Sequence, residues 1–305
     1  MAKPQAKGKA RPKERRATWR EVLKAEQPVL LPAAFDALSA RMIERAGFAA
    51  YQIGGFALSG AQFALPDVDL LHFGEINQAA RGIIEASSLP VLIDCDDGYG
   101  DAKNVTRTVR GHEAIGASAL FIEDQQAPKR CGHMGHKKVL PVETMVAKIE
   151  AAVAARTDPE TFLIARTDAL EPLGVDEALR RAEKCLEAGA DGVYVEEPTT
   201  VEQLEKIGRT FRGVPQVANM LEGGGKTPWL SPRELHDLGF AMVLYPTTLL
   251  FRVARALQRG LADLKAGHPL PADDAVQFDE YERIVGLPDW AAIEERFSTA
   301  HPHGE

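Results

Sequence analysis

The sequence predicts an α/β protein, a (βα)8 TIM barrel with helices appended at its C-terminal end. Short apolar segments, rich in Val, Ile and Leu without strict alternation, recur eight times from residue 28 onward. This pattern is typical of parallel strands that are buried on both faces. Segments with helical periodicity separate them, and the strand–helix units fit within about 240 residues, close to the usual length of such a barrel. An open doubly wound sheet is the alternative, but this many units in succession favour the barrel.

The expected strands leave room for a helix between each pair. In chain order they span residues 29–33, 49–54, 90–95, 119–124, 162–167, 192–196, 215–220 and 242–246. Amphipathic helices are expected at residues 36–47, 104–116, 142–157, 175–189 and 231–239. Four segments (ERAGFAAYQI, EAIGASALFI, EAGADGVYVE and HDLGFAMVLY) run from a helix through a glycine into a strand. Gly at a helix C-terminus is the usual left-handed cap, so these segments indicate a repeated unit.

Three regions are expected along the chain: a disordered basic tail at residues 1–17, a catalytic barrel at 18–267 and a helical extension at 268–305. Residues 1–16 hold seven basic side chains and one acidic, so the net charge of −8 leaves about −14 for the rest of the chain. A body this acidic is not expected to bind nucleic acid, because phosphate contacts need a basic surface.

The composition also bears on the compartment. No apolar run approaches the roughly 18 residues of a membrane span, and no segment resembles a signal peptide. The cysteines, Cys95, Cys131 and Cys185, are few, odd in number and widely spaced, which indicates reduced thiols rather than a disulfide framework. We therefore expect a cytoplasmic protein without a membrane partner.

Acidic side chains stand at the ends of two neighbouring strands. Asp94 and Asp96 end the third strand two residues apart, and Glu123 ends the fourth. In a (βα)8 barrel the active site forms where the strands end, and alternate residues of a strand point the same way. Carboxylates that meet there repel one another unless a cation lies between them, and their hard oxygens suit Mg²⁺ or Mn²⁺. The alternative is that each acid caps a helix or pairs with Lys or Arg.

The later strands end in other polar side chains. Arg166 ends the fifth strand and offers a planar fork that matches a substrate carboxylate; an internal ion pair with Glu196 or Asp168 is the alternative, and both roles can coexist. Asn219 ends the seventh strand, before GGGKT. This segment is not a P-loop, because Met220 stands where that motif requires Gly. Its glycines let backbone N–H groups approach an anion, or form a flexible turn.

A glycine-containing loop, residues 125–138, follows the fourth strand and is expected to be a mobile lid. Within it, Cys131 stands among Lys129, Arg130 and His133, an electropositive setting that should lower the pKa of the thiol. Cys131 is therefore a candidate nucleophile or proton donor. A solvated basic loop with an incidental cysteine is the alternative. A zinc site is disfavoured, because the other cysteines stand at no zinc-like spacing.

Taken in order, these motifs resemble a known family. The segments YQIGG, LPD, LIDCDDGYG, FIEDQ, PKRCGH, IARTDA, VEEP and VANMLEGGGKTPW are similar to those of the isocitrate lyase/phosphoenolpyruvate mutase superfamily. The resemblance runs from about Thr18 to about Leu264. It is closest to the short-chain branch, which includes 2-methylisocitrate lyases, 2,3-dimethylmalate lyases, petal-death type 2-alkylmalate/oxaloacetate lyases and carboxyphosphonoenolpyruvate phosphonomutases.

The resemblance implies a Mg²⁺-dependent (βα)8 barrel that cleaves a carbon–carbon bond in a 2-hydroxy- or 2-oxo-dicarboxylate. It also implies a homotetramer, a dimer of dimers, in which subunits exchange the C-terminal helix. By position, Cys131 corresponds to the general acid of the lyases, Arg166 and Tyr51 to further catalytic residues, and Asp94, Asp96 and Glu123 to the metal site. The residues expected to bind substrate are Gly54, Gly55, Asp67, Lys129, His133, Glu196, Asn219 and Thr227. Tyr51 and a metal-bound water are both open as the general base.

Two residues depart from the family pattern. Phe121 stands where the methylisocitrate-cleaving branch typically has His, and Ile53 stands where Ser or Thr is common. An apolar wall disfavours a tricarboxylate, so we expect an oxaloacetate, dimethylmalate or alkylmalate-like substrate. The alternatives are a 2-methylisocitrate lyase, a carboxyphosphonoenolpyruvate or phosphoenolpyruvate phosphonomutase, and a catalytically silent barrel that binds a metal–dicarboxylate complex.

Overall fold

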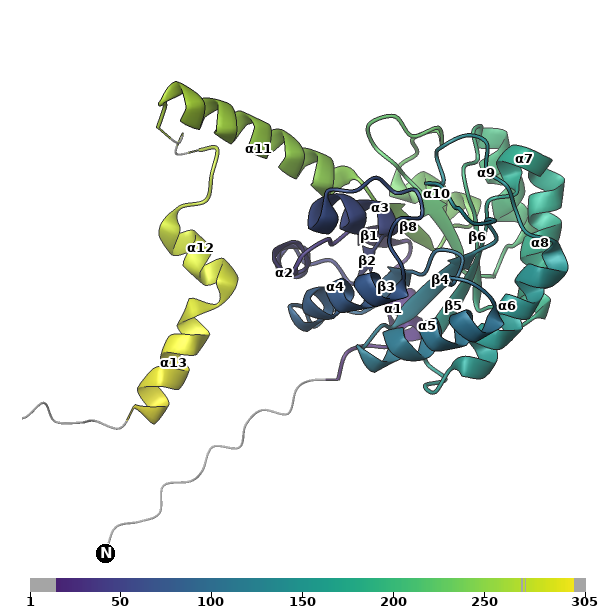
Figure 1. Cartoon of the computed structure of the whole chain (residues 1–305), viewed down its shortest axis with the longest axis horizontal. Helices are drawn as coiled ribbons and strands as arrows, with labels where there is room; N and C mark the ends of the chain where they lie inside the picture. The colour runs from purple at the N-terminus through teal and green to yellow at the C-terminus, as the bar shows by residue number, and fades with distance from the viewer. Residues whose placement is uncertain (1–14, 270, 272, 299–305) are drawn as a thin grey trace, which may run out of the picture.

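The computed structural model describes residues 15–269, 271 and 273–298, and each predicted strand segment contains a strand. The strands are β1 Val29–Pro32, β2 Tyr51–Ile53, β3 Val91–Asp94, β4 Ala119–Glu123, β5 Phe162–Thr167, β6 Gly192–Val195, β7 Gln216–Asn219 and β8 Met242–Tyr245. They form one parallel sheet in the order β1-β8-β7-β6-β5-β4-β3-β2. Its two end strands meet through the bridge between Ala33 and Gln52, and Ala34 N donates to Gln52 O at 2.8 Å. The (βα)8 barrel is confirmed (Figure 1).

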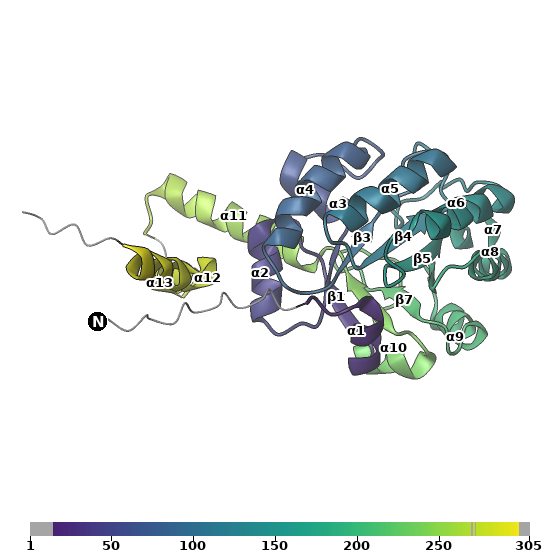
Figure 2. The ribbon, with the colours of Figure 1, turned by 90° about the horizontal axis from the view of Figure 1, so that it is seen from below.

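Helices surround the barrel (Figure 2). They are α2 Ala37–Arg45, α4 Phe73–Glu85, α5 Ala102–Ala114, α6 Val142–Ala155, α8 Val175–Glu187, α9 Val201–Thr210 and α10 Pro232–Leu238; short helical turns lie at α3 Gly55–Leu58, η1 Ser59–Phe63 and α7 Leu170–Leu173. The glycines of the four repeated segments, Gly47, Gly116, Gly189 and Gly239, have φ of 83°, 95°, 102° and 112°. These left-handed values confirm the predicted helix caps, because a side chain is disfavoured there.

The barrel interior is a column of alternate strand residues. At its N-terminal end, helix α1 (Trp19–Ala25) places the fully buried Trp19 in one cluster with Val29 and Leu31 of β1. Toward the other end, on the five strands β3 to β7, the inward position two residues further along is polar. The pairs are Leu92 and Asp94, Phe121 and Glu123, Ile164 and Arg166, Tyr194 and Glu196, and Val217 and Asn219. An apolar floor therefore supports a polar mouth.

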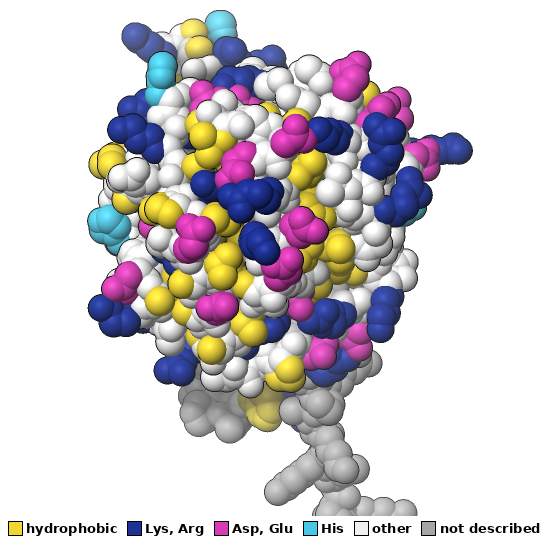
Figure 3. All heavy atoms as spheres, turned by 90° about the vertical axis from the view of Figure 1, so that its right-hand side faces the viewer, with side chains coloured by type: hydrophobic (Ala, Val, Ile, Leu, Met, Phe, Trp, Pro, Cys, Tyr) yellow, Lys and Arg dark blue, Asp and Glu magenta, His cyan; other side chains and the backbone are white. Residues whose placement is uncertain are grey.

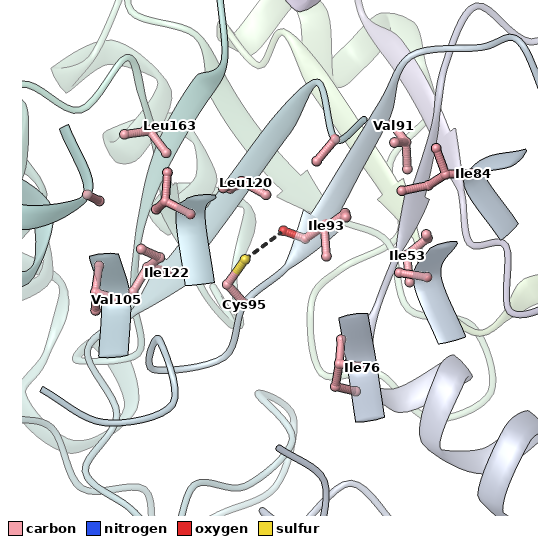
Figure 4. Close-up of a cluster of buried hydrophobic side chains, with 14 of the residues drawn as sticks. Ile53, Ile76, Ile84, Val91, Ile93, Cys95, Val105, Leu120, Ile122 and Leu163 are labelled. Atoms are coloured by element: carbon pink, nitrogen blue, oxygen red, sulfur yellow. Dashed lines mark hydrogen bonds between the residues drawn. The ribbon is translucent and has the colours of Figure 1, made fainter. Parts of the chain in front are cut away.

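The outward positions of the same strands pack against the helices. Ile53, Ile93 and Ile122 lie in a cluster with Ile76 of α4 and Val105 of α5 (Figure 4). On the side of the barrel that α8 and α9 cover, Lys and Arg alternate with Asp and Glu (Figure 3). Ion pairs on α8, such as Arg180 with Glu177 at 2.7 Å, account for part of this alternation.

The C-terminal helices leave the barrel. They are α11 Thr248–Ala266, α12 Phe278–Val285 and α13 Leu287–Phe297, and Figure 1 shows α11 projecting away from the sheet. The first turn of α11 still packs on the barrel through Leu249 and Leu250, and the helix beyond it is exposed, ahead of the boundary at residue 268 that the sequence had suggested. Periodicity alone could not show this, because an amphipathic helix has the same pattern whatever covers it. Among the described residues, no helix is both long and apolar enough to cross a membrane.

The boundary of the basic tail also needs correction. Most of the predicted tail, residues 1–14, lies outside the described residues, but residues 15–17 are described. The Arg16 guanidinium donates to four carbonyl oxygens: those of Ile84 at 3.0 Å, Ser87 at 2.8 Å, Ser88 at 3.3 Å and Gly116 at 2.8 Å. Arg16 thus joins the ends of α4 and α5 and belongs to the fold.

We expect Arg16→Ala to lower the free energy of unfolding by about 1–3 kcal/mol, because carbonyls at two helix ends lose a charged donor. Urea denaturation followed by circular dichroism measures this change. Arg15→Ala is the matched control: its guanidinium forms an exposed ion pair with Glu21, and its loss should leave the midpoint unchanged. Equal midpoints for the two variants would contradict the structural role of Arg16.

Candidate active site

The polar side chains that the sequence predicted at the strand ends meet at one mouth of the barrel. Arg166 Nη1 lies 3.2 Å from Glu123 Oε2, and Asn219 Nδ2 donates to Glu196 Oε1 at 3.1 Å. All four residues are buried. These side chains lie close together because all strands of a closed parallel barrel end on the same side.

Arg166 is held mainly by Asp168. Its Nε and Nη2 donate to the two oxygens of that carboxylate at 2.9 and 3.1 Å, which confirms the internal ion pair weighed from the sequence. Burial opposes the charge of Asp168, but Arg166 and Lys137 outweigh it and keep its pKa below the usual value. A guanidinium has five N–H donors, and Asp168 and Glu123 engage three. Two remain for a substrate carboxylate.

The predicted metal acids share this mouth with an ammonium group. Lys129 Nζ pairs with Asp67 Oδ1 at 2.5 Å and also with Asp96 Oδ1. Asp94 Oδ2 accepts from Gly55 N at 3.1 Å. Burial raises the pKa of Asp96 to about 7, although Lys129 opposes the shift. Lys129, expected to contact substrate, instead occupies the acidic cluster.

The acids do not form a ready metal cage. Across residues 15–298 as described, no three His, Cys, Asp or Glu side chains lie close enough together to hold a metal ion. Glu123 is nevertheless buried, and its Oε1 has no hydrogen-bond partner among the described residues. Burial also raises its pKa well above the usual range. Such hard oxygen atoms suit a divalent cation.

Apart from Asp96 Oδ1, which is ion-paired with Lys129, four buried polar atoms around the mouth have no hydrogen-bond partner within the described part of the chain: Glu123 Oε1, Glu196 Oε2, Asn219 Oδ1 and Thr227 Oγ1. Buried polar atoms are normally hydrogen-bonded, so these mark the place of a polar ligand. All four belong to residues that the sequence predicted for metal or substrate binding. Gly54 and Gly55 begin α3 beside them, and a Cβ at Gly55 would lie 3.4 Å from both Asp94 and Asp96.

The lid, residues 125–138, lies over Arg166 and Glu196. Gly132 approaches them so closely that a Cβ there would overlap the Arg166 guanidinium and the Glu196 carboxylate. By contrast, nothing lies within 4 Å of a Cβ at Gly135. The lid therefore needs a glycine at 132 to reach the site.

Cys131 is half-buried in the lid, and its surroundings correct one prediction. Burial, together with the Asp67 carboxylate, raises the pKa of the thiol to about 11, whereas the sequence had suggested a lowered value. The lysine that should have lowered it is engaged elsewhere, since Lys129 faces Asp67 and Asp96. The thiol stays protonated at neutral pH, which suits a proton donor rather than a nucleophile.

His133 connects the lid to the loop that follows β7, residues 221–229 (the 221–229 loop). Its Nδ1 accepts from Lys226 N at 3.2 Å, and its Nε2 lies 3.3 Å from Glu196 Oε1. The same Nε2 lies 3.3 Å from Asn219 Nδ2, so His133 contacts both pocket residues. Thr227 follows Lys226 on the same loop.

The sequence missed a second set of charges behind the site. Lys137 Nζ donates to Gly132 O at 2.5 Å and pairs with Asp168 at 3.1 Å and Glu197 at 2.8 Å. Lys226 also pairs with Glu197. No sequence signal separates the buried Lys137 from its exposed neighbour Lys138.

Tyr51 and Ile53 are not part of the site, which corrects two predictions. Both occupy outward positions of β2 and pack in the cluster between barrel and helices, where Figure 4 shows Ile53 beside Ile76. Burial raises the pKa of Tyr51 far above its usual value, and its nearest charges are Arg16 and Glu44, at the opposite end of the barrel. Tyr51 is therefore not the catalytic base.

Phe121, in contrast, does lie against the site. Its ring meets Tyr194 edge-on, with centroids 5.6 Å apart. The Arg166 guanidinium carbon lies 5.8 Å from the Phe121 ring centre and 5.1 Å from that of Tyr194. The two rings form an aromatic floor under the arginine.

Comparisons with known proteins agree with this arrangement. Residues 19–265 match the sequence profile of the family described as phosphoenolpyruvate phosphomutase. A 2,3-dimethylmalate lyase from Eubacterium barkeri is 39% identical over 285 residues, which cover 93% of this chain and 98% of that protein. The match covers nearly the whole of both chains, so the similarity is not confined to a motif.

Two solved structures share the fold. Oxaloacetate acetylhydrolase in complex with 3,3-difluorooxalacetate superposes with a TM-score of 0.85 at 28% identity, over 91% of this chain and 95% of the other. A phosphonopyruvate hydrolase complex with oxalate and Mg²⁺ gives 0.81 at 30% identity, over 91% and 97%. The family resemblance of the motifs is thereby confirmed: the chain belongs to the phosphoenolpyruvate phosphomutase family, within the isocitrate lyase/phosphoenolpyruvate mutase superfamily.

Proposed function

We propose that this protein is a Mg²⁺-dependent carbon–carbon lyase that cleaves a 2-hydroxy- or 2-oxo-dicarboxylate of the 2,3-dimethylmalate, 2-alkylmalate or oxaloacetate class. The observation that carries the proposal is the buried cluster of Glu123, Arg166 and Glu196 at the mouth, which the lid covers at Gly132, next to Cys131. The similarity to a dimethylmalate lyase and to an oxaloacetate-cleaving structure supports the choice of substrate class.

Asp94, Asp96 and Glu123 would hold the metal, Mg²⁺ or Mn²⁺, through their carboxylate oxygens. The metal, when bound, supplies Lewis-acid charge for the carboxylate and C2 oxygen of the substrate. The unpartnered Glu123 Oε1 supports this assignment, as does the Mg²⁺ in the structure of phosphonopyruvate hydrolase.

In the proposed reaction the C2 hydroxyl of a 2-hydroxy acid, or of the hydrate that a 2-oxo acid forms with one water molecule, gives its proton to a carboxylate of the mouth. The C2–C3 bond breaks, and C2 becomes the carbonyl carbon of a 2-oxo acid or, from the hydrate, a carboxyl carbon. The electron pair of the broken bond stays on C3, next to a carboxylate. The two free N–H groups of Arg166 stabilise the negative charge that develops there. Cys131 then donates the proton of its Sγ to C3. The closed lid keeps water from supplying that proton instead.

The aromatic floor favours a dicarboxylate over methylisocitrate. Phe121 and Tyr194 bring no charged group below Arg166, so a third carboxylate there would be buried without a partner. Ile53 no longer enters this argument, because it faces away from the site. A reduced Cys131 is essential to the role we propose, so we also infer a reducing compartment, the cytoplasm.

Assays of the purified enzyme with Mg²⁺ should show turnover of 2,3-dimethylmalate, 2-ethylmalate or oxaloacetate that exceeds turnover of 2-methylisocitrate. Product formation is followed by coupled detection of the 2-oxo acid or oxalate. Chelation with EDTA should abolish activity, and added Mg²⁺ or Mn²⁺ should restore it. Dominant turnover of methylisocitrate would contradict the substrate class. Conversion of a phosphonopyruvate, followed by ³¹P NMR, would indicate a phosphonomutase instead.

Cys131→Ser should reduce kcat by at least about 100-fold, because the serine hydroxyl is a far weaker acid than the thiol. Calorimetry with Mg²⁺ and oxalate should show unchanged ligand binding. Cys185→Ala, which alters a buried helical cysteine away from the site, is the control and should retain kcat. Wild-type protein that binds both ligands and turns over no substrate would indicate a silent binding barrel.

We further propose that the protein is a homotetramer in which subunits exchange the C-terminal helices. The supporting observation is an apolar stripe on α11, where Leu257, Leu261 and Leu264 are 61%, 64% and 74% exposed. An apolar stripe this exposed is typical of a face that another protein surface covers.

Light scattering should give a mass of four chains of 33.2 kDa for the wild type. Leu261→Glu should shift the protein to smaller species, because it places a charge in the apolar stripe. Gln258→Glu adds the same charge outside the stripe and should leave the mass unchanged. A wild-type mass of one chain would exclude the tetramer.

A further inference from the structure

Two loops that reach the site from different strands share one buried carboxylate. The lid follows β4 and the 221–229 loop follows β7, far apart in the chain. Lys137 of the lid pairs with Glu197 Oε2 at 2.8 Å, and Lys226 of the 221–229 loop pairs with Glu197 Oε1. Each oxygen of Glu197 therefore has its own lysine, and each lysine comes from a different loop.

The three partners differ in exposure. The side chains of Lys137 and Glu197 are 0% and 1% exposed, whereas that of Lys226 is 41% exposed. A buried carboxylate is stable only while it is paired, so Glu197 depends on both loops being in place. If either loop opens, one oxygen of this buried carboxylate loses its cation, which leaves part of its charge uncompensated.

The ion pair between Lys137 and Glu197 also lies close to the part of the lid that carries Cys131. Lys137 donates to Gly132 O at 2.5 Å, next to Cys131 and at the point where the lid meets Arg166 and Glu196. Glu197 itself has φ of +63°, a left-handed conformation that is rare for a residue with a side chain. Glu197 comes directly after Glu196 in the chain, so it belongs to the same strand end that forms the pocket.

We propose that Glu197 is a positioning residue that couples closure of the lid to closure of the 221–229 loop, through Lys137 and Lys226. The two loops then close over the substrate as one unit and bring Cys131 to its working position together. A second contact works in the same direction, since His133 of the lid accepts from Lys226 N at 3.2 Å. The inference rests on the proposed function only for the role given to Cys131, because the coupling of the two loops can be measured in the protein without substrate.

The reactivity of Cys131 toward 5,5′-dithiobis(2-nitrobenzoate) tests the coupling without substrate or metal. Cys95 and Cys185 are buried, so the reaction of the native protein reports on Cys131, and Cys131→Ser gives the background. Lys226→Met and Lys137→Met should each accelerate the modification about tenfold or more, because each releases the lid. Lys226→Arg keeps the charge of Lys226 at a half-exposed position and should restore the wild-type rate.

Matched controls separate coupling from general loosening. Lys138→Met removes the exposed neighbour of Lys137 and should leave the rate within about twofold of wild type. Thermal melting of Lys226→Met should stay close to wild type, because Lys137 still pairs with Glu197 and only a surface loop is released. This variant keeps the test valid if Lys137→Met fails to fold. In the double variant Lys137→Met/Lys226→Met, the rate should fall well short of the product of the single effects, because both act through Glu197.

Two outcomes would overturn the proposal: an unchanged rate of Cys131 modification in Lys226→Met, or rates that multiply in the double variant. Neither outcome depends on turnover. If the lid is coupled but the protein cleaves none of the proposed substrates, only the proposed function is wrong. If the lid is uncoupled in an active lyase, only this inference is wrong. In an active enzyme, Lys226→Met should lower kcat/KM, and Lys226→Arg should restore it.

Discussion

The two-residue period of a β-strand, imposed on eight short strands in a closed barrel, is the constraint on which this structure depends. Each strand sends alternate side chains inward, and there is room for only a few before the barrel ends. The lower inward positions, such as Leu92 and Ile164, fill the interior with apolar volume. The next inward positions, Asp94 and Arg166, face the mouth. A shift of one residue in either strand would bury the charge among the helices.

Packing charges at such a mouth requires compensation, and the structure supplies it in layers. Asp168 neutralises Arg166 from behind, and Lys137 neutralises Asp168 in turn. On the other side, the Lys129 ammonium lies between Asp67 and Asp96. What remains uncompensated, above all Glu123 Oε1 and two N–H groups of Arg166, faces the space where a metal and a dicarboxylate would bind.

The lid completes the site because of how closely it can approach. Gly132 has no Cβ, so its backbone reaches Arg166 and Glu196, and the neighbouring Cys131 is carried into a setting that keeps its thiol protonated. Lys137 of the lid binds carboxylates that follow β5 and β6, Asp168 and Glu197, so the lid is fastened to the ends of two barrel strands.

The sequence by itself determined the barrel, its eight strands, the glycine caps and the polar residues at the strand ends, because these follow from local periodicity and from the chemistry of each residue type. It could not determine which way Tyr51 and Ile53 face, since β2 is buried on both sides and the sequence does not show whether Gln52 or its two neighbours point into the barrel. Nor could it predict the thiol pKa of Cys131 or separate Lys137 from Lys138. Those depend on which charge lies nearest in space, and only the tertiary structure brings Asp67, Asp168 and Glu197 to the lid.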